Sequence, residues 1–142
     1  MPTYAAARHL DAPREDVWAL LAEPTRLGDW WPGIRGIDPD RRGLAPGARW
    51  RVRASARPTS VIGRRPDLAG TLVFLEVKPP EFAAWQFVDG RIDVELRLAE
   101  AGANRTWAEL TVGAPLLGGL RRSLPHKALT CLQGLCQTGD PR

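Results

Sequence analysis

The chain has 142 residues, of which 44% are hydrophobic and 25% are charged. This composition is typical of a single globular domain over residues 1–142, and it excludes wholesale disorder. No apolar run approaches the roughly 18 residues of a membrane span. The first residues lack the basic-then-apolar pattern of a secretory signal, so we expect a cytoplasmic protein.

The charge of the chain is unevenly distributed. Lys and Arg total 20 against 16 Asp and Glu, and residues 41–65 contain eight arginines and no acidic residue. This segment is interpreted either as a solvated sheet face with a basic loop or as a docking surface for an acidic protein or an anionic head group. No helix-turn-helix, zinc-finger or RNA-binding aromatic motif accompanies it, so no nucleic-acid partner is predicted.

The sequence predicts no metal site and no cofactor. Cys131 and Cys136 are the only cysteines, and their spacing to His9 and His126 matches no metal-ligand pattern. Five residues apart in a predicted helix, the two cysteines point in different directions and are expected to be free thiols. A dinucleotide fingerprint, a phosphate-binding glycine loop and a Ser-His-Asp pattern are all missing from the sequence.

The first third of the chain predicts a strand followed by two short helices. Residues 3–9 suit an edge strand. Asp11 and Pro13 favour a helix start, and apolar residues at helical spacing follow through Leu21. A second short helix is expected over residues 25–31, before Pro32 and Gly33.

The middle of the chain predicts antiparallel strands. Residues 49–57 alternate, with Trp50 and Val52 on one face and Arg49, Arg51 and Arg53 on the other. Further strands are expected at 71–77, 82–88, 91–98 and 106–112, with Asp89-Gly90 as a hairpin turn. Residues 71–77 are apolar on both faces, so the sequence does not assign which face of that strand points inward.

The last part of the chain predicts one amphipathic helix of roughly two dozen residues. Pro125 lies inside this segment and is expected to kink the helix or divide it at Ser123. The apolar residues that recur every three or four positions are Leu116, Leu120, Leu124, Ala128, Leu132 and Leu135.

This layout is α+β, and four stretches of the chain carry a family resemblance. They are Asp11–Leu21, Asp29–Pro32, Gly47–Trp50 and Val77–Trp85. They resemble the SRPBCC superfamily, the START-like helix-grip fold of lipid-transfer proteins and polyketide cyclases, over about residues 3–136. The resemblance implies a curved antiparallel sheet of about six to seven strands wrapped around the C-terminal helix, with two short helices after the first strand.

The resemblance also implies a ligand cavity between the sheet and the C-terminal helix. The residues expected to line it are Trp30, Trp31, Trp50, Val52, Phe74, Trp85, Val94, Leu96, Leu120 and Leu124. Cyclases of the family place an arginine and a hydroxyl beyond a strand tryptophan, where this chain has Val52 and Ala54. A register shift of one residue would instead place Arg51 and Arg53 inside.

Candidates for acid–base chemistry are weak, and the sequence assigns no catalytic residue. His126 is a candidate general acid or base that could face the cavity, although a surface position is the alternative. Glu76 shares a strand face with Leu72 and Phe74, and a buried carboxylate there could transfer protons. An outward-facing Glu76 is the alternative.

Three functions follow from these observations. The first is binding or carriage of a hydrophobic or aromatic small molecule. The second is a polyketide cyclase or dehydratase-like activity. The third is an interaction module that docks an acidic partner through Arg49, Arg51 and Arg53. The oligomeric state is left open.

Overall fold

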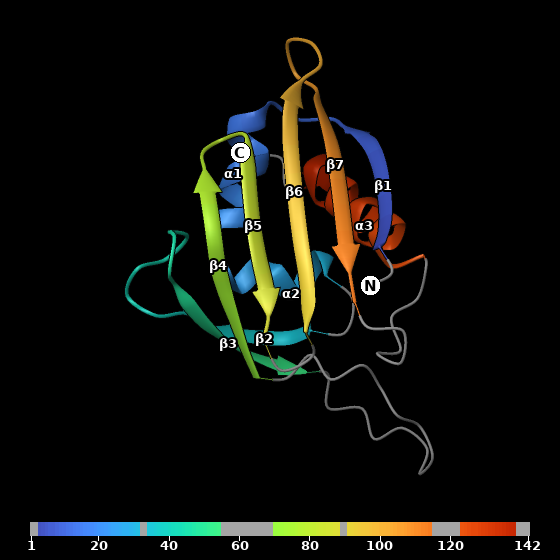
Figure 1. The fold of residues 1–142 in the computed structure, drawn as a ribbon. Helices are drawn as coiled ribbons and strands as arrows, with labels where there is room; N and C mark the ends of the chain where they lie inside the picture. The colour runs from blue at the N-terminus through green and yellow to red at the C-terminus, as the bar shows by residue number, and fades with distance from the viewer. Residues whose placement is uncertain (1–2, 32–33, 55–69, 89–90, 115–122, 139–142) are drawn as a thin grey trace.

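Seven strands form one antiparallel sheet, with every helix on the same side of it (Figure 1). The computed structural model describes residues 3–31, 34–54, 70–88, 91–114 and 123–138. The strands are β1 Thr3–Leu10, β2 Ile34–Asp38, β3 Arg49–Ala54, β4 Gly70–Lys78, β5 Phe82–Phe87, β6 Ile92–Glu100 and β7 Thr106–Gly113. The helices are α1 Arg14–Ala22, α2 Leu27–Trp30 and α3 Leu124–Thr138, with a 3-10 turn at Pro24–Arg26.

The spatial order of the strands is β1-β7-β6-β5-β4-β3-β2. The first strand therefore pairs with the last, and β2 and β3 curl across the far end of the sheet (Figure 1). The helix α3 packs on β1 and also contacts α2 and β7. This arrangement confirms the predicted α+β class and is consistent with a helix-grip fold.

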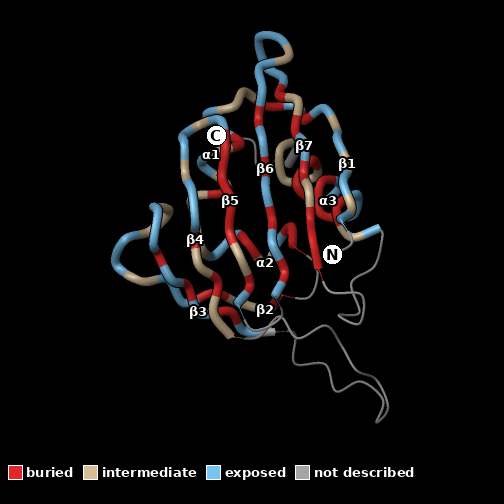
Figure 2. Tube along the Cα trace, viewed as in Figure 1, coloured by how far each residue is buried: buried red, intermediate tan, exposed pale blue. Residues whose placement is uncertain are grey.

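Alternation along the strands separates a core face from an outer face. In β6, Ile92, Val94 and Leu96 are buried while Asp93 and Glu95 are exposed, as the banding of Figure 2 shows. Side chains two residues apart share a face, so a single burial pattern orients the whole strand. The buried side of the sheet faces the helices.

The same alternation places the arginines of β3 outside. Trp50 and Val52 are buried, whereas Arg49, Arg51 and Arg53 are exposed. The alternative register with Arg51 and Arg53 inside is therefore wrong, because burying unpaired guanidinium groups would be far costlier than burying an indole and an isopropyl group.

A β-bulge settles the orientation of β4. Leu72 and Phe74 point into the core, and the register shifts between Phe74 and Glu76 against β5. The extra residue breaks the strict alternation, so both Leu75 and Glu76 lie exposed. Glu76 thus does not share a face with Leu72 and Phe74.

The described C-terminal helix is shorter than the sequence pattern suggested. It begins at Leu124, directly after a turn at Ser123, and Pro125 lies in its first turn. Proline is tolerated there because its missing N–H needs no intrahelical partner, so Pro125 does not kink the described helix. A division at Ser123 stays a prediction, because residues 115–122 lie outside the described residues. The segment with Leu116 and Leu120 lies outside the described residues.

A polar clasp fixes α3 to the start of the domain. Gln133 on α3 is buried, and its side-chain oxygen accepts the backbone N–H of Asp11 at 2.9 Å. Its amide nitrogen donates in turn to the Asp11 carboxylate. Nearby, the Thr106 hydroxyl donates to the Ala12 carbonyl at 2.7 Å, which ties β7 to the same turn.

We expect Gln133→Ala to lower the free energy of unfolding by about 1–3 kcal/mol, because it removes two hydrogen bonds that the buried Gln133 side chain makes to Asp11. Gln86→Ala is the matched control, since Gln86 donates to Asp93 on the exposed outer face. That control should cost no more than about 0.5 kcal/mol. Urea denaturation of both variants makes the comparison, and equal losses would contradict the role of the clasp.

Candidate functional site

The core beneath α2 is a cluster of tryptophans. Trp30 and Trp31 come from the end of α2, and Trp85 comes from β5. The ring centroids lie 5.6 Å apart for Trp30 and Trp31, and 6.3 and 6.1 Å from each of these to Trp85. All three contacts are edge-to-face, which is the favourable geometry for aromatic quadrupoles.

Within the described residues, the three indole N–H groups of this cluster have no hydrogen-bond partner. Trp30, Trp31 and Trp85 are at most 3% exposed, and their Nε1 atoms are buried and unpaired within the described structure. Trp50 differs, because its Nε1 donates to the Gly43 carbonyl at 3.0 Å. A buried donor without an acceptor costs about 1–3 kcal/mol, so three in one place require an explanation.

Space inside the core is nearly filled by these rings. The void that Trp30 and Trp85 share with Trp50 and Phe74 measures only about 10 Å³. A void of this size has room for about one water molecule at most. The described core therefore holds no preformed cavity of ligand size at this position.

A wider space opens on the other side of Trp30 and Trp31. This α2–α3 groove has a volume of about 460 Å³, within the usual size range of small-molecule sites. Its lining residues are Gly28, Asp29, Trp30, Trp31, His126, Lys127, Thr130 and Cys131. Trp30 borders both the groove and the small interior void.

The structure distributes the sequence-predicted lining residues over two environments. Trp30 and Trp31 face the groove. The following residues are buried in the core: Trp50, Val52, Phe74, Trp85, Val94 and Leu96. Leu124 is partly buried against that core, and Leu120 lies outside the described residues.

Sequence reasoning missed the α3 side of the groove. The apolar stripe through Ala128 and Leu132 packs into the core, whereas His126, Thr130 and Cys131 occupy the adjacent helix face. These residues recur at helical spacing, which is the signal that could have identified them. They are mostly polar, and polar residues on a helix are more often simply solvated.

The two weak catalytic candidates lie far apart in the fold. His126 is exposed at the groove rim. Glu76 lies on the outer face of the sheet, where its carboxylate pairs with the Lys78 ammonium at 3.1 Å. The described buried side chains include no charged group, and the polar ones are Thr106 and Gln133. Nowhere in the described residues do three His, Cys, Asp or Glu side chains gather as a metal site.

The thiols beside the groove have distinct environments. Cys131 and Cys136 are both free, with Cys131 exposed and Cys136 half-buried. Burial, followed by the charges of Asp11 and Asp16, raises the pKa of the Cys136 thiol from 9.0 to about 11. Because the folded pKa lies above the unfolded one, this thiol favours the native state below pH 9.0, and that contribution is lost as the pH rises toward 11.

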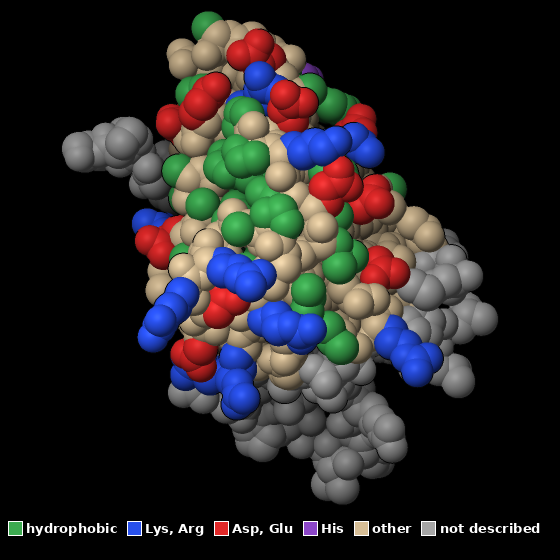
Figure 3. Space-filling view, turned by 60° about the vertical axis from the view of Figure 1, so that its left-hand side comes forward, with side chains coloured by type: hydrophobic (Ala, Val, Ile, Leu, Met, Phe, Trp, Pro, Cys, Tyr) green, Lys and Arg blue, Asp and Glu red, His purple; other side chains and the backbone are tan. Residues whose placement is uncertain are grey.

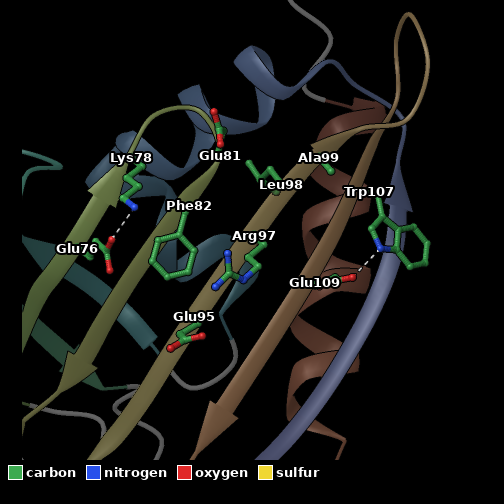
Figure 4. Close-up of a pocket in the computed structure, with 10 residues that line it drawn as sticks. All are labelled: Glu76, Lys78, Glu81, Phe82, Glu95, Arg97, Leu98, Ala99, Trp107 and Glu109. Atoms are coloured by element: carbon green, nitrogen blue, oxygen red, sulfur yellow. Dashed lines mark hydrogen bonds and ion pairs between the residues drawn. The ribbon is translucent and has the colours of Figure 1, made fainter.

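A second hollow lies on the outer face of the sheet, away from the tryptophan cluster (Figure 4). Its volume is about 440 Å³. The Arg97 guanidinium stacks over the Phe82 ring, 4.5 Å from its centroid. Nearby, the indole N–H of Trp107 donates to the Glu109 carboxylate at 3.0 Å. This outer hollow is therefore polar and partly aromatic.

Comparison with solved structures places the fold among small bacterial proteins. EF2215 from Enterococcus faecalis, a conserved protein of unknown function, superposes with a TM-score of 0.70 at 17% identity, covering 99% of this chain and 74% of that one. NE0264 from Nitrosomonas europaea gives 0.68 at 19% identity, covering 97% and 96%. CalU16 from Micromonospora echinospora gives 0.61 at 22% identity, covering 98% and 76%. At these identities the likeness shows the fold.

No curated protein matches the chain. In the described residues, no helix is both long and apolar enough to span a membrane. The family model for polyketide cyclase/dehydrase and lipid transport proteins matches residues 1–130, which is nearly the whole chain. Together with the seven-stranded sheet and its packed C-terminal helix, this match shows that the chain belongs to the polyketide cyclase/dehydrase and lipid transport family.

Proposed function

We propose that the protein binds a small aromatic or otherwise apolar molecule that carries hydrogen-bond acceptor oxygens. The observation that carries the proposal is the set of three buried, unpartnered indole donors at Trp30, Trp31 and Trp85. An acceptor oxygen that reached any one of these donors would remove the desolvation penalty of that donor. Flat apolar rings supply the surrounding contact surface for an aromatic ligand.

The α2–α3 groove is the proposed entrance. Its floor is formed by Trp30 and Trp31, which belong to the same cluster. Because Trp30 lines both the groove and the interior void, a change in its side-chain rotamer would be the route by which the ligand reaches the inner rings. The ligand then lies between α2 and α3, with its acceptor directed inward.

Carriage is favoured over turnover as the role of this site. The described core has no charged side chain, so the tryptophan cluster offers hydrogen-bond donors but no general base. His126 at the rim is the single titratable imidazole beside the groove lining. A cyclase or dehydratase-like activity is the second candidate, and it rests on this histidine and on the family description.

A matched pair of ligands tests the donor role directly. Acetylnaphthalene and isopropenylnaphthalene have nearly the same shape, but only the first has a carbonyl acceptor. We expect the ketone to bind wild-type protein about 3- to 10-fold more tightly, as one net hydrogen bond implies. Isothermal titration, supported by native mass spectrometry for any co-purified ligand, measures the difference.

Single Trp→Phe variants identify the donors. Each of Trp30→Phe, Trp31→Phe and Trp85→Phe removes an N–H and keeps an aromatic ring, and at least one should abolish the preference for the ketone. Trp107→Phe is the matched control, because that indole lies on the outer face and already donates to Glu109. Equal binding of both ligands, or a preference that survives all three core variants, would refute the donor role.

The location of the ligand is tested by thiol labelling. Cys131 is exposed and lines the groove, so iodoacetamide at about pH 8 should modify it first. Cys136 should react far more slowly, because its pKa of about 11 leaves little thiolate. Saturating acetylnaphthalene should slow labelling of Cys131, as followed by peptide mass spectrometry. Unchanged labelling under saturation would place binding outside the groove.

A further inference from the structure

The outer face of the sheet carries three bands of side chains. The arginine stripe is Arg49, Arg51 and Arg53 on β3. The apolar strip on β4 and β5 is Val73, Leu75, Phe82 and Ala84, in which Leu75 is 57% exposed, Val73 is half-buried, and Phe82 and Ala84 are each 8% exposed. The carboxylate band, Glu76, Glu81, Glu95 and Glu109, surrounds the outer hollow. The apolar strip thus has basic groups on one side and predominantly acidic groups on the other.

Figure 3 shows this face in space-filling form. Hydrophobic side chains gather in its middle, Asp and Glu predominate above them, and Lys and Arg predominate below. The exposed apolar side chains are therefore flanked by opposite charges on opposite sides. A surface of this kind is complementary to a rotated copy of itself.

Within the described residues, each of the two charged bands contains groups that form no ion pair. Arg53 pairs with Asp38, and Glu76 pairs with Lys78. By contrast, the guanidinium groups of Arg49 and Arg51 form no ion pair within the described part of the chain, and neither does the carboxylate of Glu95. Complementary unpaired charges across an interface guide association and fix its register.

The outer hollow is suited to a guanidinium group. It already stacks one, that of Arg97, on the ring of Phe82, and it adds the Trp107 indole and several carboxylates. Arginine favours this combination, because its planar cation stacks on rings and donates to carboxylates at the same time. Lys78 and Arg97 also line the hollow, but the four carboxylates Glu76, Glu81, Glu95 and Glu109 outnumber these two cations, so its charge favours a further guanidinium group.

We propose that a second copy of this chain docks on the outer face, forming a two-fold symmetric dimer. An axis lying in the plane of contact and running along the apolar strip would place each arginine stripe over the carboxylate band of its partner. Leu75 would be covered near the axis. Arg49 or Arg51 would enter the partner's outer hollow, and the reciprocal contact would form by symmetry.

A nucleic acid fits this face poorly, because the carboxylate band would repel its phosphates. An unrelated acidic protein would occupy the arginine stripe but leave the apolar strip and the outer hollow uncovered. Only a partner with all three bands in reverse order uses the whole surface, and this chain is such a partner.

Charge reversal tests the dimer through two variants. Arg49→Glu with Arg51→Glu makes both outer bands acidic, and Glu81→Arg with Glu95→Arg makes both basic. Wild-type protein should dimerise at low salt and dissociate as salt rises, because exposed charges are screened over about 8–10 Å at physiological ionic strength. Each variant alone should weaken self-association by about tenfold or more. Sedimentation velocity over a range of concentrations measures these equilibria.

Mixing the two variants is the decisive experiment. In an equimolar mixture, every acidic band meets a basic one, so a heterodimer should form at concentrations where each variant alone stays monomeric. Glu15→Arg with Glu23→Arg is the matched control for Glu81→Arg with Glu95→Arg. It makes the same charge change, on exposed residues at the two ends of α1. This control should dimerise as wild type does.

Several results would overturn the proposal. The wild-type chain could stay monomeric at low salt, or the reversal variants could dimerise as strongly as wild type. The third such result is a mixture of the two variants that stays monomeric although circular dichroism shows that both are folded. If a reversal variant does not fold, Arg49→Gln with Arg51→Gln replaces it and should weaken dimerisation and flatten its salt dependence. The ligand tests concern the opposite side of the sheet, so each proposal can fail alone.

Discussion

The packing of Trp30 and Trp31 against Trp85 is the constraint on which the site depends. This contact joins α2 to the sheet, fills the space beneath the helices and forms the floor of the α2–α3 groove. It also isolates three N–H donors from acceptors. Edge-to-face contacts and apolar burial offset that cost in part. Close packing stabilises this interior, and a hydrogen bond from an unsatisfied donor to the acceptor of a ligand would lower its free energy further.

Strand alternation divides the molecule into two surfaces with separate chemistry. Along each strand, one set of alternate side chains packs into the apolar core, and the other set forms a charged outer face. Because successive strand residues point to opposite sides, substitutions on one face leave the other largely undisturbed. The α2–α3 groove and the arginine stripe can therefore serve different partners within a single thin sheet. The clasp between Gln133 and Asp11 keeps α3 on the core side.

Sequence reasoning succeeded where one side of a strand is buried and the other solvated. The alternation of residues 49–54 and 92–98 oriented β3 and β6 because water penalises the wrong face at every second residue. It could not orient β4, because the bulge beside Leu75 follows from pairing with β5 and not from local pattern. Whether Pro125 kinks the C-terminal helix depends on where that helix begins, and the apolar pattern alone does not mark its first residue. The unpaired indoles depended on their neighbours in space, which a one-dimensional pattern does not contain.

The pairing of β1 with β7 has a consequence for synthesis on the ribosome. The first strand cannot find its sheet partner until residues 106–113 have left the exit tunnel, and Asp11 must wait still longer for Gln133, 122 positions away. Such long-range closure is slow, because chain entropy is lost before many contacts form. The nascent β1 must therefore stay free of other partners meanwhile. Its alanine-rich sequence, with small side chains at positions 5–7, gives competing strands little apolar surface to hold.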